Sequence, residues 1–148
     1  MEQVDGPNTG RVVVIIVDDE PDIAREIADG LSADGIEAQI AHSAEEALAH
    51  MRQAGGAVGV VVTDLKMPGL DGFGLIARLR EDPTGEMPEI LLMSGHASPD
   101  ERRRAMQAGV SAVLRKPFAW AEFSDAINGA LDRARSRRET AATATAQD

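Results

Sequence analysis

The chain has 148 residues, which suits one domain with its own hydrophobic core and is too short for two ordinary ones. Acidic residues outnumber basic ones 25 to 15, and the formal net charge of -10 argues against a general nucleic-acid-binding surface. The absence of cysteine excludes disulfides and thiolate metal sites, and the three histidines lack the spacing of a structural zinc site. Because no apolar run approaches the roughly 18 residues of a membrane span and no signal-peptide core is visible, we expect a cytoplasmic protein without membrane contact.

Short apolar segments typical of buried strands lie at 12–17, 37–41, 58–62, 89–93 and 110–114. The segments between them carry apolar residues at i, i+4 spacing, which is typical of amphipathic helices. Pro21 suits the first turn of one helix, and Ser43 and Ser98 each begin a capping-box pattern. A last helix is expected from about Ala119 to Arg135.

This alternation of strands and helices predicts an α/β fold. Strand–helix units joined by right-handed crossovers favour a (βα)5 doubly wound five-stranded parallel sheet, in the flavodoxin-like order 2-1-3-4-5. We expect one domain over residues 11–132. Neither end of the chain has an apolar period, so we expect a disordered N-terminal segment over 1–10 and a low-complexity, unstructured C-terminal tail over 133–148.

Polar side chains follow several of the predicted strands, at the edge where an open parallel sheet binds ligands. The carboxylates of Asp18, Asp19 and Asp64 should meet there, where they would repel one another unless a cation lies among them. Oxygen ligands alone favour Mg²⁺. Ser94 and Lys116 would add a hydroxyl and a positive charge that suit phosphoryl oxygens, with Asp64 as the nucleophile that forms an acyl phosphate.

Taken singly, each of these residues has a structural explanation. Asp18 and Asp19 suit the positive end of a helix, Asp64 suits the turn before Pro68, and Lys116 suits an exposed surface. Their joint position at one edge of one sheet favours the functional interpretation.

The sequence resembles the receiver domain of bacterial two-component response regulators, in a stand-alone, flavodoxin-like form. The resemblance covers roughly residues 11–132 and rests on the motifs IIVDDE (15–20), TDLKMPGLDG (63–72), LLMSGHA (91–97) and LRKPF (114–118). It implies that Asp64 is the phosphoacceptor, that Asp19 binds Mg²⁺ directly, and that Asp18 binds it mostly through water. The backbone carbonyl of Lys66 would be a further metal ligand.

The resemblance also implies that Ser94 and Lys116 contact the phosphoryl group, and that the bond between Lys116 and Pro117 is cis. Lys66 and His96 would occupy positions that tune the lifetime of the acyl phosphate. One departure concerns Val113, because the family often carries an aromatic ring there that moves inward on activation. A valine has no ring to swing, so this coupling is not expected here.

The resemblance implies a phosphodonor and a protein target. The donor would be a phosphohistidine on a sensor kinase or histidine phosphotransfer protein. The target would bind the face formed by the fourth helix, fifth strand and fifth helix, where Arg102, Arg103 and Arg104 favour an acidic partner. The chain would be a monomer or a phosphorylation-dependent homodimer, without an output domain and without direct nucleic-acid contact.

Three alternatives stay open at this point. A phosphatase with Asp64 or Asp18 as nucleophile would turn over small phosphomonoesters rapidly. An interaction module with a vestigial acidic pocket would not respond to acetyl phosphate or beryllofluoride. The chain could also be one piece of a longer protein such as a hybrid kinase.

Overall fold

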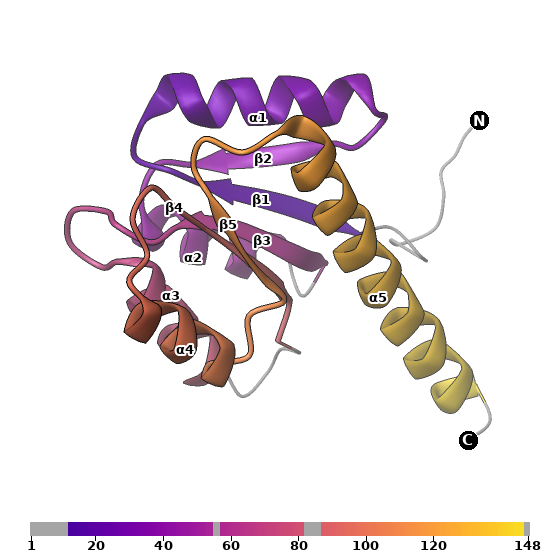
Figure 1. Cartoon of the computed structure of the whole chain (residues 1–148). Coiled ribbons are helices and arrows are strands. Elements are labelled where there is room, and N and C mark those ends of the chain that lie inside the picture. The colour runs from indigo at the N-terminus through magenta and orange to yellow at the C-terminus, as the bar shows by residue number, and fades with distance from the viewer. Residues whose placement is uncertain (1–11, 55–56, 82–86, 147–148) are drawn as a thin grey trace.

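The computed structural model describes residues 12–54, 57–81 and 87–146, so the expected disorder of residues 1–10 lies outside it. Strands and helices alternate as predicted (Figure 1). The strands are β1 Val13–Val17, β2 Ala38–Ala41, β3 Val58–Asp64, β4 Glu89–Ser94 and β5 Ala112–Arg115. The helices are α1 Pro21–Ala33, α2 Ala44–Ala54, α3 Gly72–Glu81, α4 Pro99–Gln107 and α5 Trp120–Ala146. No helix in the described ranges is both long enough and apolar enough to cross a bilayer.

The strands form one parallel sheet in the order β2-β1-β3-β4-β5, which confirms the predicted topology. Central strand β3 is buried at every position, as expected for a strand covered on both faces. Its register pairs Thr63 with Val17 of β1 and Asp64 with Met93 of β4, while Ser94 pairs with Arg115 of β5. The carboxyl ends of these four strands therefore lie at the same edge of the sheet.

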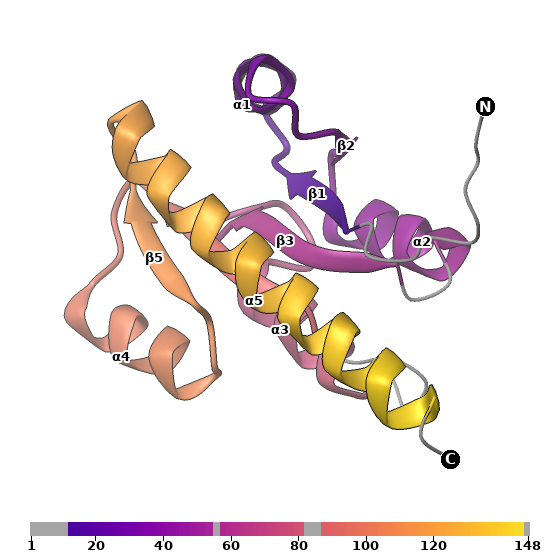
Figure 2. The same cartoon turned by 90° about the vertical axis from the view of Figure 1, so that its right-hand side faces the viewer.

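The helices cover both faces of the sheet (Figures 1 and 2). One core contains Ile27 and Leu31 of α1 with Phe123 and Ile127 of α5. The opposite core contains side chains of α2, α3 and α4, including Phe73. These two layers hold the strands rigidly, which fixes the positions of the polar residues at the strand ends.

Helix α5 is longer than the sequence suggested, and this corrects the expected unstructured tail. It continues past Arg135 to Ala146 and extends beyond the sheet in Figure 2. Four of the eleven residues from 136 to 146 are alanine, the residue with the highest helix propensity, and the segment contains neither glycine nor proline to end the helix. Low complexity was therefore a poor indicator of disorder here.

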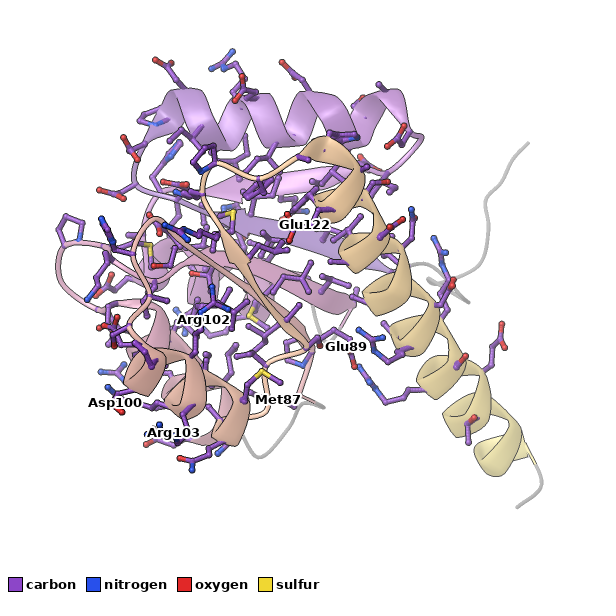
Figure 3. The ribbon with its side chains drawn as sticks, in the orientation of Figure 1. Met87, Glu89, Asp100, Arg102, Arg103 and Glu122 are labelled. Atoms are coloured by element: carbon purple, nitrogen blue, oxygen red, sulfur yellow. The ribbon has the colours of Figure 1, made fainter. Side chains whose placement is uncertain are left out.

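Glu89, at the start of β4, anchors this part of α5 to the sheet (Figure 3). Its carboxylate accepts hydrogen bonds from Ser111 Oγ at 2.6 Å and Arg133 Nε at 2.7 Å, and it also pairs with Arg137. Burial alone would raise the pKa of Glu89, but the hydrogen bonds from Ser111, Arg137 and Arg133 outweigh it and lower the pKa to about 2.

We expect Glu89→Gln to lower the free energy of unfolding at pH 7 by about 1–2 kcal/mol, because both arginines lose a charged partner. The depressed pKa means that the parent's extra stability is complete above pH 4.5 and is lost as the pH falls toward about 2. Urea unfolding across this range measures the difference between parent and variant. Glu122→Gln, at an exposed acid of the same helix, should change stability by less than about 0.5 kcal/mol. A constant difference from pH 7 to pH 2 would contradict the assignment.

Candidate functional site

Two carboxylates and a lysine meet at the carboxyl edge of the sheet. Asp18 follows β1 and is fully buried, Asp64 ends β3 and is 7% exposed, and Lys116 follows β5. The Lys116 Nζ atom lies 3.0 Å from Asp18 Oδ2 and 3.4 Å from Asp64 Oδ2. The other Asp18 oxygen, Oδ1, accepts a hydrogen bond from the Glu20 backbone N–H at 3.0 Å. Lys116 therefore bridges Asp18 and Asp64, whose strands β1 and β3 are neighbours in the sheet.

The charges of this cluster are coupled. Burial raises the pKa of Asp64, and the nearby Asp18 raises it further, whereas Lys116 acts in the opposite direction. Burial alone would lower the pKa of Lys116, but the hydrogen bond to Asp18 and the charges of both carboxylates raise it. Lys116 thus stays charged, while ionised Asp64 is held in an unfavourable environment.

Because its pKa is raised, ionised Asp64 should reduce the stability of the fold. The loss grows as the pH rises above 3.8, the ordinary pKa of an aspartate. We expect Asp64→Asn to raise the free energy of unfolding by on the order of 1 kcal/mol at pH 7 in EDTA, and to have little effect in acid. Urea unfolding at both pH values measures this. Asp125→Asn, at an exposed position on α5, is the matched control, and an equal gain there would contradict the interpretation.

Asp18, Glu20 and Asp64 form a group that could hold a metal ion, with one carboxylate oxygen from each lying within 4.8 Å of the others. Oxygen donors of this kind fit a hard divalent cation such as Mg²⁺. Glu20 was missed as a ligand because it directly precedes α1, where an acidic residue has an ordinary helix-dipole explanation. Asp19, the predicted direct ligand, is not in this group, so its role and that of the Lys66 carbonyl stay predictions.

Ser94 is buried at the end of β4 and 1% exposed. Its Oγ accepts a hydrogen bond from the His96 backbone N–H at 3.1 Å, and its carbonyl accepts one from the Lys116 N–H at 2.8 Å. The Lys116–Pro117 bond is cis, as the resemblance implied. Ser94 and Lys116 are thus held together by the backbone at the same edge.

Lys66 and His96 are both exposed beside this edge. The Lys66 ammonium points to α4, where it lies 2.8 Å from Glu101 Oε2. Its backbone N–H donates a hydrogen bond to the Asp64 carboxyl group, which favours the ionised form. The sequence placed Lys66 near the site but contained no sign of its pairing with Glu101.

Gly72 supports the backbone of Asp64 from the start of α3. Its N–H donates to the Leu65 carbonyl at 2.9 Å, and a Cβ atom at this position would lie 2.9 Å from the Asp64 carbonyl oxygen. Only glycine fits this close approach without displacing backbone. The sequence pattern contained this glycine within TDLKMPGLDG, but its contact with Asp64 depends on how the loop folds back.

Val113 is half-buried in β5 and packs against the core on the side of α2, α3 and α4. Aromatic rings gather instead at the start of α5, where Phe123 stacks on Phe118 at 5.3 Å and lies 5.0 Å from Trp120. Phe118 and Trp120 line a pocket of about 450 Å³ that also includes Lys116. These three rings lie on the face of the sheet opposite Val113, whereas Phe73 belongs to the same core as Val113.

Comparison with known proteins decides the family. A model of the response regulator receiver domain matches residues 14–128. The chain belongs to this family. It is a receiver domain of the two-component class, with the flavodoxin-like fold and an acidic group at the edge where the family's motifs lie.

Individual relatives agree with this assignment. The chain is 36% identical over 114 residues to the gliding motility regulatory protein of Myxococcus xanthus, and this covers 74% of the chain but 14% of that protein. It is 33% identical over 104 residues to an uncharacterized 14.6 kDa protein of Leptolyngbya boryana, covering 70% of the chain and 78% of that protein. A crystal structure of a response regulator receiver domain protein from Clostridium thermocellum matches with a TM-score of 0.75 and 31% identity, covering 82% of the chain and 95% of that structure.

Proposed function

We propose that this receiver domain takes a phosphoryl group onto Asp64 from a phosphohistidine of a sensor kinase or histidine phosphotransfer protein. The observation that carries the proposal is the position of Lys116, which lies between the carboxylates of Asp18 and Asp64 in a chain of this family. Receiver domains of response regulators interact with histidine kinases, so a donor of this class is the natural partner.

The proposed transfer uses side chains of this edge. An oxygen of the Asp64 carboxylate forms a bond to phosphorus, the P–N bond of the phosphohistidine breaks, and the imidazole leaves with the electron pair and takes up a proton from solvent. The Lys116 ammonium would pair with an oxygen of the transferred group, and the Ser94 hydroxyl would donate a hydrogen bond to another. Water later hydrolyses the acyl phosphate.

Asp18, Glu20 and Asp64 would hold Mg²⁺ at this site, with Asp19 and the Lys66 carbonyl as further predicted ligands. Bound Mg²⁺ would supply positive charge against the phosphoryl oxygens. The excess of acidic groups supports this assignment, because three carboxylates meet here and a single lysine ammonium lies between two of them, which leaves negative charge for a divalent cation to balance.

Incubation with acetyl phosphate and Mg²⁺ tests the proposal by intact mass. The parent should gain a phosphoryl adduct of about 80 Da, and Asp64→Ala should gain none. An adduct that persists in Asp64→Ala would overturn the site assignment, and a parent without any adduct would favour a vestigial pocket. Rapid turnover of a small phosphomonoester by the parent would favour the phosphatase alternative.

We further propose that the α4–β5–α5 face carries the signal to a protein target. Contacts within the chain occupy two of the three arginines of α4. Arg103 pairs with Asp100 at 2.8 Å (Figure 3). Arg104 lies 4.0 Å above the Phe73 ring. Arg102 is exposed and has no ion-pair partner in the described part of the chain. An acidic target or a second phosphorylated copy would meet a face with less free positive charge than the sequence suggested.

A further inference from the structure

Helix α4 is attached to the domain mainly by polar contacts. Ala105 is its one buried residue, so little apolar surface holds it in place. Arg104 stacks on Phe73 of α3, and Arg80 of α3 donates to the Ala108 carbonyl at the end of α4. Elements with few buried apolar contacts open most easily, so small changes in these polar contacts should change the order of α4.

One polar contact of α4 involves the loop that follows Asp64, namely the ion pair between Lys66 and Glu101. Glu101 Oε2 lies 2.8 Å from Lys66 Nζ, and Oε1 accepts the Ser98 backbone N–H at 3.0 Å. The Ser98 Oγ in turn accepts the Glu101 N–H at 3.1 Å, which completes a capping box at the start of α4. A single side chain therefore connects the loop after the phosphoacceptor strand to the cap of α4.

Lys66 can exchange Glu101 for another anionic partner at little cost in stability. The side chains of Lys66 and Glu101 are 66% and 26% exposed, and exposed pairs contribute little to stability. A phosphoryl group on Asp64 would carry a charge of about -1.5 to -2 in place of the single charge of the aspartate, two residues from Lys66, and this exceeds the single charge of Glu101. The stronger anion should therefore compete for the same ammonium.

We propose that phosphorylation of Asp64 draws Lys66 away from Glu101 and thereby loosens the start of α4. This inference rests on the proposed function of Asp64. It supplies a charge-driven link from the site to the α4 face in a chain whose Val113 has no ring to move.

Amide hydrogen exchange of the α4 segment, residues 99–107, tests the inference with Mg²⁺ and beryllofluoride as the phosphoryl mimic. In the parent, the mimic should accelerate exchange by about two- to fivefold, the effect expected from losing one exposed ion pair. Glu101→Gln keeps a side chain that can complete the capping box but lacks the charge. Without the mimic, amide exchange of α4 in this variant should be as fast as in the parent with the mimic, and adding the mimic should change it little. Lys66→Gln should behave in the same way.

Asp100→Asn is the matched control, because it removes one acidic charge from the same turn of α4 without touching Lys66. It should retain the parent's response. A full response in Glu101→Gln, or no acceleration in the parent, would overturn the inference. Phosphorylation of Asp64 by acetyl phosphate is scored separately by mass, so an adduct that forms without any change in α4 refutes this inference and leaves the proposed function standing.

Discussion

Lys116→Met should lower the free energy of unfolding by about 3 kcal/mol at pH 7 in EDTA, because it leaves buried carboxylates without their positive partner. Asp18 is fully buried, and the Lys116 ammonium lies within 3.4 Å of both Asp18 and Asp64. The methionine keeps much of the apolar stem, so the loss reports the charge more than the packing. The same variant should lose most of its reaction with acetyl phosphate, since no ammonium remains to pair with the phosphoryl oxygens.

Urea unfolding in EDTA and in Mg²⁺ measures this effect. The deficit of Lys116→Met should shrink when Mg²⁺ is added, because the cation offsets the repulsion between the carboxylates, and it should also shrink in acid as Asp64 takes up a proton. Arg115→Met removes an exposed cation one residue earlier and serves as the control. Equal losses for the two variants would mean that Lys116 is an ordinary surface charge.

Gly72→Ala is expected to destabilise the fold by about 1–2 kcal/mol and to slow phosphorylation of Asp64. The added Cβ would lie 2.9 Å from the Asp64 carbonyl oxygen and 3.1 Å from Leu65 Cα, both of which belong to backbone in the core. Overpacking of this kind costs about 1–3 kcal/mol, which exceeds the gain of up to about 1 kcal/mol from replacing a helical glycine. Displacement of Asp64 should then weaken its alignment with Lys116.

Gly74→Ala provides a control on the same helix. Its Cβ would meet the side chain of Leu70, which can move, and not the backbone at the site. Denaturant unfolding should give a change of less than about 1 kcal/mol, and the rate of adduct formation with acetyl phosphate should match that of the parent. If Gly72→Ala reacts as fast as Gly74→Ala, the close approach of α3 does not position Asp64.

Several features of this receiver domain were predictable from local sequence. The buried strands appear as runs of β-branched residues, and the helices appear through apolar spacing and caps such as Ser98 with Glu101. Parallel order then brings Asp18 and Asp64 together, because both residues end neighbouring strands. The motifs around Asp64, Ser94 and Lys116 carried the resemblance to the family, and each lies within a few residues of a strand end.

Other features depended on contacts between residues far apart in the chain. The pairing of Lys66 with Glu101 and of Glu89 with Arg133 spans 35 and 44 residues, and no local pattern indicates such partners. Glu20 belongs to the group that could hold a metal ion and Asp19 does not, because the turn between β1 and α1 determines which of these side chains lies beside Asp64.

The sequence by itself determined the order of elements, the parallel sheet and the edge at which the site lies, because periodicity and strand ends are local properties. Only the tertiary structure decided which charged side chains pair, how far α5 continues and where Gly72 meets Asp64. These outcomes follow from side-chain reach and packing in three dimensions. Alternative ion pairs of an exposed charged side chain differ by only about 1 kcal/mol in free energy, so local sequence does not determine which pair forms.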